Sequence, residues 1–144
     1  MKKALTKSEV NALLDAAQTV REHSHSPYSH FKVGAAVLTE DGQIFVGTNV
    51  ENSSYGLTVC AERNAVSAAV SAGCRRFRAL ALITPKLKGQ KFNSPCGACR
   101  QVLGEFFPPD TPIYIAVLDG QKRTVYCKKL SELMPFPFEK FTEK

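Results

Sequence analysis

The sequence predicts an α/β fold of three layers, α/β/α, in which a mixed five-stranded sheet has helices on both faces. Three observations lead to this prediction. A capped amphipathic helix opens the chain, an almost continuous apolar run at residues 77–84 fits a strand buried on both faces, and helical and extended segments alternate. Elements of these kinds bury their apolar surfaces by packing helices against the two sides of one sheet.

The first third of the chain predicts a helix followed by a hairpin. Thr6 and Glu9 have the spacing of a capping box, in which each side chain bonds the backbone amide of the other residue. Apolar residues then recur at helical spacing along one face: Val10, Leu13, Leu14, Ala17 and Val20. Residues 31–38 are expected to form a strand, with an Asp-Gly turn at 41–42 and the partner strand at 43–46.

The rest of the chain predicts two more long helices, three strands and a final helical turn. A second helix is expected from residue 60 to about residue 72, where Gly73 ends it. Pro95 is expected to open a third helix, which the Pro-Pro pair at 108–109 stops. The strands and the turn are expected at residues 77–84, 113–118, 124–127 and 130–134.

Length and composition favour a single domain, residues 1–144, of a cytoplasmic protein. The chain carries a net charge of +6, but its basic residues are scattered and form no stripe interleaved with aromatics, so a nucleic-acid partner is not expected. No apolar run approaches the length of a membrane span. Five cysteines, an odd number of which three have metal-ligand spacing, favour a reducing compartment.

Three cysteines and a glutamate have the pattern of a catalytic metal site. Cys60, Cys96 and Cys99 supply three thiolates for one zinc ion and leave the fourth position to water, whereas structural sites usually have a fourth protein ligand. Glu62 would carry protons to and from that water. On an ideal helix, Cys60 and Glu62 lie about 200° apart, so both reach one site only if Cys60 precedes regular helix. We therefore expect the ligands at helix N-termini, where partial positive charge favours thiolates.

The charge of such a site needs an offset. Zinc bound by three thiolates is negative overall, which weakens its effect on the pKa of bound water. Arg63, next to Glu62, and the two helix N-termini are the expected sources of positive charge. Arg100, directly after Cys99, is a weaker candidate.

Other interpretations of the cysteines remain open at this point. A Cys-x-x-Cys pair alone also fits a redox pair or half of a structural zinc site. Such a structural site needs a fourth ligand, and the histidines that could supply it all lie upstream, none in a matching doublet: His23, His25 and His30. Cys74 and Cys127 are expected to be small buried side chains that bind no metal.

The segment Asn-Val-Glu-Asn at 49–52 carries a second signal. In extended chain, Asn49 and Glu51 point to the same side, and a carboxamide beside a carboxylate suits the hydroxyl groups of a sugar. An exposed turn is the alternative, because Asn is common there. Because this segment lies eight residues before Cys60, the sugar-binding interpretation is the stronger of the two.

Together these motifs resemble the cytidine deaminase family, specifically its small branch with three cysteine ligands. The resemblance runs from Pro27 to Phe138 and includes the segments Cys-Ala-Glu at 60–62 and Pro-Cys-Gly-Ala-Cys at 95–99. It implies one Zn²⁺ per chain and the hydrolytic deamination of cytidine and deoxycytidine to uridine, deoxyuridine and ammonia, in pyrimidine salvage. Glu62 would be the acid–base residue, and Arg63 would bond the ligand sulfurs.

The same resemblance implies a nucleoside pocket completed across a homotetramer. Asn49 and Glu51 would bind the ribose, mainly at its 3′-hydroxyl. Tyr55 and Phe138 would reach a neighbouring subunit's site, although Phe136 competes with Phe138 for this role. The pyrimidine base would meet a second set of residues: Phe31, Ala61, Ser94 and Pro95. For Phe31, a core position at the start of a strand is nearly as good an interpretation.

Three rival functions remain. A cytosine deaminase that acts on RNA or single-stranded DNA would use similar chemistry, but we would expect a coherent basic groove and no sugar-binding pair. A deaminase of cytosine-containing antibiotics would not need the sugar motif either. A non-catalytic zinc-binding interaction module would leave Glu62 without a task.

Overall fold

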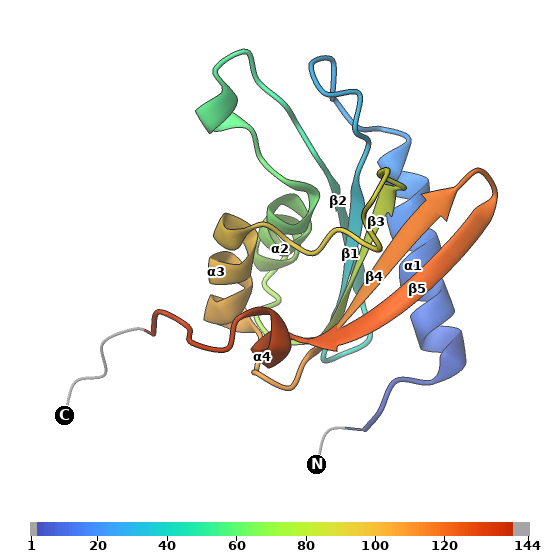
Figure 1. Ribbon diagram of the computed structural model, residues 1–144. Helices are drawn as coiled ribbons and strands as arrows, with labels where there is room; N and C mark the ends of the chain where they lie inside the picture. Colours follow the sequence, from blue (N-terminus) through green and yellow to red (C-terminus); the bar gives the residue numbers. More distant parts are fainter. Residues whose placement is uncertain (1–2, 140–144) are drawn as a thin grey trace.

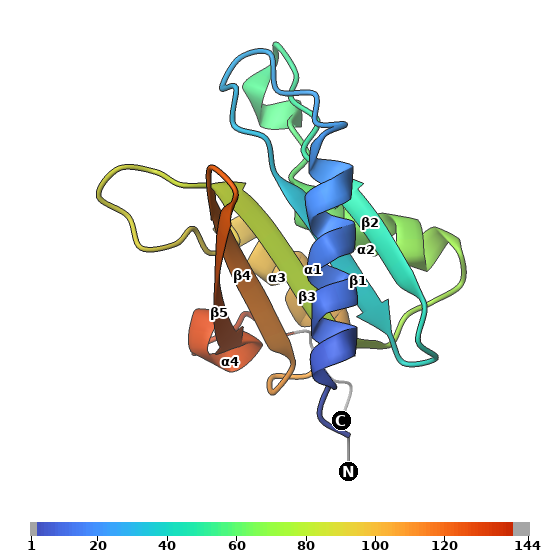
Figure 2. The same ribbon diagram turned by 90° about the vertical axis from the view of Figure 1, so that its right-hand side faces the viewer.

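A five-stranded sheet with helices on both faces makes up the part of the chain that the computed structural model describes, residues 3–139. The strands lie in the order β2-β1-β3-β4-β5. Helix α1 covers one face, and α2 and α3 cover the other (Figures 1 and 2). The predicted three-layer α/β/α fold is therefore confirmed. The element bounds are α1 Lys7–Arg21, β1 Gly34–Thr39, β2 Ile44–Thr48, the 3₁₀ turn η1 Tyr55–Leu57, α2 Ala61–Ser71, β3 Phe77–Pro85, α3 Gly97–Phe106, β4 Pro112–Asp119, β5 Lys122–Lys129 and α4 Leu130–Leu133.

The sheet is mixed, and its centre is fully enclosed. β3 and β4 run parallel, whereas β1–β2, β1–β3 and β4–β5 are antiparallel. Every residue of β1 is buried, and β3 is buried along nearly its whole length, which confirms the prediction for residues 77–84. This burial on both faces follows from the layer of helices on each side of the sheet.

Helix α1 begins with the predicted capping box. The Thr6 hydroxyl accepts a hydrogen bond from the Glu9 amide at 3.1 Å, and the Thr6 amide donates to the Glu9 carboxylate at 2.8 Å. The same carboxylate pairs with Arg78 of β3 at 3.0 Å, and this pairing lowers the pKa of Glu9. Leu13, Leu14 and Ala17 bury the other face of the helix against the sheet.

Helix α2 packs so closely on β2 that only glycine fits at one strand position. A Cβ added to Gly47 would lie 2.3 Å from the backbone nitrogen of Ala65 and 2.5 Å from the carbonyl oxygen of Ala61. This approach holds α2, and with it the Cys-Ala-Glu segment at its start, against the sheet.

We expect the Gly47→Ala variant to be less stable than the parent protein by about 1–3 kcal/mol, the usual cost of overpacking a rigid contact. Urea unfolding followed by circular dichroism measures the difference. Gly56→Ala is the matched control, because a Cβ there meets no heavy atom within 4 Å. Equal stability of the two variants would contradict the close approach as the reason for glycine at position 47.

The structure differs from the sequence predictions in several details. Helix α3 begins at Gly97 instead of Pro95, because Cys96 takes an extended conformation as the N-cap. β1 begins at Gly34 instead of Phe31, because the backbones of Phe31 and Val33 hydrogen-bond the Asn49 side chain and not a neighbouring strand. The predicted burial of Cys127 is wrong, because it is exposed, whereas Cys74 is partly buried and packs against the core. Cys127 lies on β5, an edge strand on which exposed residues predominate.

Within residues 3–139, none of the helices has the length and apolar character needed to cross a membrane.

Candidate metal centre and active site

The first residues of two helices carry the proposed metal ligands. Cys60 is the N-cap of α2 (φ −73°, ψ 157°), and Cys96 is the N-cap of α3 (φ −65°, ψ 166°). Their carbonyl oxygens accept from the amides of Asn64 at 3.2 Å and Arg100 at 2.9 Å, so each helix starts immediately after its cysteine. Cys60 therefore precedes regular helix, as its proximity to Glu62 in sequence required.

The three sulfur atoms lie close enough to bind one ion. The Sγ atoms of Cys60 and Cys96 are 3.9 Å apart, and those of all three cysteines lie within 4.8 Å of one another. Tetrahedral zinc with bonds of about 2.3 Å to sulfur separates its sulfur ligands by roughly 3.8 Å. Within residues 3–139, no histidine lies close enough to join this group of ligands. The donor set thus fits a zinc ion with one position left for water.

Hydrogen bonding among the thiols prepares one of them as a thiolate. A bond from Cys99, with further bonds from Arg63 and Cys96, lowers the pKa of Cys60 to about 5. The same bond to Cys60 raises the pKa of Cys99, which is fully buried. Because thiol ligands bind metals in their deprotonated form, metal binding would release the remaining protons.

Glu62 lies on the first turn of α2 and is 4% exposed. Burial raises the pKa of Glu62 to about 7, and the nearby Cys60 thiolate acts in the same direction. A carboxyl group with a pKa near neutrality can both accept and donate a proton, which is what an acid–base residue requires.

Arg63 lies against the ligands, as expected. Its Nη2 donates to the Sγ of Cys60 at 3.6 Å and to the carbonyl oxygen of Thr58 at 3.3 Å. Its Nε is buried and has no hydrogen-bond partner among the described residues. The guanidinium is therefore next to the thiolate charge that it was expected to offset.

Known proteins identify the family of this site. Residues 7–115 match the family model of the cytidine and deoxycytidylate deaminase zinc-binding region. The chain belongs to the cytidine deaminase family. A cytidine deaminase of Sporosarcina psychrophila is 45% identical over 92% of this chain and 93% of its own length. That of Halalkalibacterium halodurans is 44% identical over 88% and 91%, respectively.

Solved structures of the cytidine deaminase family have the same fold. The structure of the Burkholderia pseudomallei cytidine deaminase aligns with a TM-score of 0.82 and 41% identity, over 93% of this chain and 100% of that one. The Mycobacterium tuberculosis cytidine deaminase aligns with a TM-score of 0.71 and 37% identity, over 90% and 97%. The match to a zinc-binding deaminase region and the position of the three cysteines agree on zinc as the cofactor.

Arg100 does not share the position of Arg63 in this cytidine deaminase-family site. Its guanidinium donates to the Ser94 hydroxyl at 2.6 Å, to the Pro95 carbonyl at 2.7 Å and to the Leu133 carbonyl. The charge-offsetting role considered for it has no support in these contacts. Sequence reasoning missed its contact with Leu133, because no local pattern connects residues 33 positions apart.

The two expected sugar-binding residues organise the loop before β1. The Asn49 amide nitrogen donates to the Phe31 carbonyl at 2.8 Å, and its oxygen accepts from the Val33 amide at 3.0 Å. Glu51 accepts from the amides of Tyr28 and Ser29, both at 3.1 Å, and from the Ser29 hydroxyl, which lowers the pKa of Glu51. Ribose binding by this pair remains a prediction.

The remaining predicted substrate contacts lie in different parts of the chain. Phe31 is half-buried against the core between the sheet and α2, and Ala61 is fully buried. Tyr55 is 74% exposed at the start of η1, and Phe138 is 73% exposed in the C-terminal tail. Both views put η1 at the upper end of the molecule and the tail near the lower end (Figures 1 and 2). Within one chain, Tyr55 and Phe138 are therefore not brought together.

Proposed function

We propose that this protein deaminates cytidine and deoxycytidine by zinc-dependent hydrolysis, releasing uridine or deoxyuridine and ammonia, as a cytoplasmic enzyme of pyrimidine salvage. The observation that carries the proposal is the buried carboxyl group of Glu62, two residues from Cys60 and beside three clustered thiols. A non-catalytic zinc module would have no use for such a group, because burying a carboxyl costs free energy. The names of the full-length relatives agree with this chemistry.

In the proposed reaction, water is activated at the metal, and the side chains transfer protons and offset charge. When bound, zinc supplies Lewis acidity that lowers the pKa of a water molecule. Glu62 takes a proton from this water and gives it to ring N3 of the pyrimidine while the water oxygen forms a bond to ring C4. Glu62 then carries the proton of the new C4 hydroxyl to the exocyclic amine, so that the C4–N bond breaks, ammonia leaves and a C4 carbonyl remains. Arg63 and the two helix N-termini offset the thiolate charge.

A nucleoside pocket formed by the chain itself completes the proposal. Asn49 and Glu51 bind the ribose, and the ring of Phe31 packs against the base, with the backbone of Ala61 bonding its edge. The Asn49 amide nitrogen carries two N–H groups, of which one bonds the Phe31 carbonyl, so the other can donate to a sugar hydroxyl. The resemblance to the family supports the 3′-hydroxyl as the main contact, which would allow both sugars.

The proposal includes a homotetramer in which Tyr55 and Phe138 complete neighbouring sites. Each lies beside a second exposed apolar residue, Leu57 next to Tyr55 and Phe136 next to Phe138, and clustered exposed apolar side chains of this kind mark an interface. Phe136 is 95% exposed, so the competition between Phe136 and Phe138 remains. Phe141, a third aromatic of the tail, lies outside the described residues. Sedimentation equilibrium tests the assembly, and a purely monomeric protein would contradict it.

We expect Arg63→Gln to fold and bind zinc but to lower kcat at least about tenfold. Loss of a hydrogen bond between charged groups costs roughly 1.5–3 kcal/mol, and here the bond helps neutralise the ligand set. Steady-state kinetics on cytidine, corrected for zinc content, measures the change. Arg75→Gln is the matched control, because Arg75 is exposed. An unchanged rate for Arg63→Gln would remove the charge-offsetting role.

The proposed function itself is tested by incubating the purified protein with cytidine and following the ultraviolet absorbance change as uridine forms. Deoxycytidine, a cytosine-containing oligoribonucleotide and single-stranded DNA serve as parallel substrates. Conversion of the two nucleosides with no reaction on the polymers is the expected result. Deamination of a polymer alone would favour the polynucleotide deaminase, and stoichiometric zinc with no reaction on any of the four would favour a non-catalytic zinc module.

A further inference from the structure

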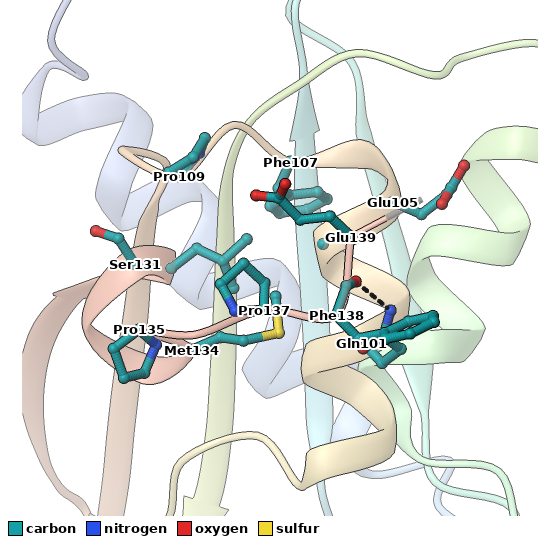
Figure 3. Close-up of a pocket in the computed structure, with 12 residues that line it drawn as sticks. Gln101, Glu105, Phe107, Pro109, Ser131, Met134, Pro135, Pro137, Phe138 and Glu139 are labelled. Carbon is teal, nitrogen blue, oxygen red and sulfur yellow. Dashed lines mark hydrogen bonds between the residues drawn. The ribbon is translucent and has the colours of Figure 1, made fainter. Parts of the chain in front are cut away.

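Helix α3 carries two of the three proposed metal ligands at its start, and two of its residues contact the C-terminal segment. Cys96 is the N-cap and Cys99 lies on the first turn. The next two residues, Arg100 and Gln101, both reach the segment that follows the sheet. Arg100 donates to the carbonyl of Leu133, the last residue of α4, and Gln101 donates to the carbonyl of Phe138 at 3.2 Å. Figure 3 shows the bond between Gln101 and Phe138.

The C-terminal segment folds over α3 and leaves a cavity of about 580 Å³ beside it. Apolar side chains from α4 and the tail, Met134 and Phe138 among them, line this space together with Phe107 from the end of α3 (Figure 3). Hydrogen bonds from Arg100 and Gln101 tie this segment to α3 beside the cavity.

Arg100 differs from Gln101 because it also reaches the loop in front of the metal ligand. Its Nε donates to the Pro95 carbonyl and its Nη2 to the Ser94 hydroxyl. Proline has no N–H group, so the carbonyl is the only backbone hydrogen-bonding group of Pro95. One planar guanidinium therefore fixes the two residues before Cys96 and the end of α4 at the same time.

We propose that Arg100 is a positioning residue of the deaminase site. It holds Ser94 and Pro95 in a fixed position relative to α3, so that Cys96 stays directed at the metal and the loop presents a fixed edge to the substrate. The inference rests on the proposed deaminase function for its effect on substrate, whereas its effect on metal retention does not require catalysis.

The variant Arg100→Met tests the proposal in the full-length, zinc-loaded protein. Transfer of zinc to a chromogenic chelator should be at least about tenfold faster than in the parent, measured at a temperature where both are folded by circular dichroism. The KM for cytidine should rise by a similar factor, with a smaller fall in kcat per bound zinc, because a loosened loop weakens substrate binding first. Arg100→Lys keeps the positive charge but lacks the planar guanidinium, so it should behave like Arg100→Met. It is the test variant if Arg100→Met does not fold.

Two control variants separate positioning from general stability. Arg75→Met removes an equal charge from an exposed position and should match the parent. Gln101→Ala loosens the tail without touching the ligand loop, so zinc transfer should keep the parent rate. The proposal is overturned if Arg100→Met and Arg100→Lys lower the melting temperature but leave zinc transfer and KM unchanged, or if Gln101→Ala releases zinc equally fast. A parent protein that does not deaminate cytidine would refute the proposed function, and the zinc-transfer comparison would still decide the role of Arg100.

Discussion

The Glu62→Gln variant is expected to bind one zinc per chain and to lose a factor of at least about 10² to 10⁴ in kcat, the usual contribution of general acid–base catalysis. Glutamine has nearly the same shape as glutamate, so the buried position accepts it without a cavity, and no ligand is removed. It cannot take a proton from water at neutral pH. Metal analysis and the absorbance assay on the same preparation measure the two quantities together.

A comparison on the neighbouring helix makes this result specific. Glu105 of α3 is exposed, and Glu105→Gln removes one carboxylate without entering the site. It should keep the parent kcat. A Glu62→Gln protein that retains zinc and most of its activity would rule out Glu62 as the acid–base residue and would leave the reason for its burial open to a structural explanation.

The second large effect concerns the metal. Cys96→Ala should lose stoichiometric zinc and essentially all deamination, because two thiolates and water form a much weaker site than three thiolates. Cys96 is exposed, unlike the fully buried Cys99, so its truncation leaves no core cavity. Loss of function in this variant would therefore report on the metal more directly than the same change at Cys99. Zinc content and the thermal unfolding midpoint, with and without added zinc, test it.

Cys127→Ala is the control for this experiment. Cys127 is exposed on β5 and is not a member of the clustered thiols, so its removal should change neither zinc content nor activity. Added zinc should raise the unfolding midpoint of Cys127→Ala as it does for the parent, and should have little effect on Cys96→Ala. Full zinc occupancy in Cys96→Ala would show that the metal is held by another ligand set.

Features that depend on a few neighbouring residues could be predicted from the sequence. The capping box at Thr6 and Glu9 acts within one turn, and the Asp-Gly turn at 41–42 needs no distant partner; there the backbone of Gly42 has a φ of +88°. The positions of the metal ligands at helix N-termini could also be predicted from the sequence. The angular separation of Cys60 and Glu62 on a helix required Cys60 to be the N-cap, and α2 begins one residue later.

Some burial predictions failed because exposure depends on where a strand lies in the sheet. The sequence around Cys127 fits a strand, and it forms one. Its exposure follows from the place of β5 at the edge of the strand order, which is a property of the whole chain. Pro95 likewise was a good signal for a nearby helix start, but Cys96 is extended as the N-cap, so the helix itself starts at Gly97.

By itself, the sequence predicted the fold class, the cluster of three cysteines and the position of Glu62 and Arg63 beside it, because caps, periodicity and ligand spacing are local; the burial of Glu62 comes from the tertiary packing. Only the tertiary structure decided what the long side chains reach. It gives Asn49 and Glu51 partners in the loop before β1, and it connects Arg100 of α3 to Leu133 of α4. Such contacts join residues that strand order and helix packing bring together, and no short-range pattern encodes them.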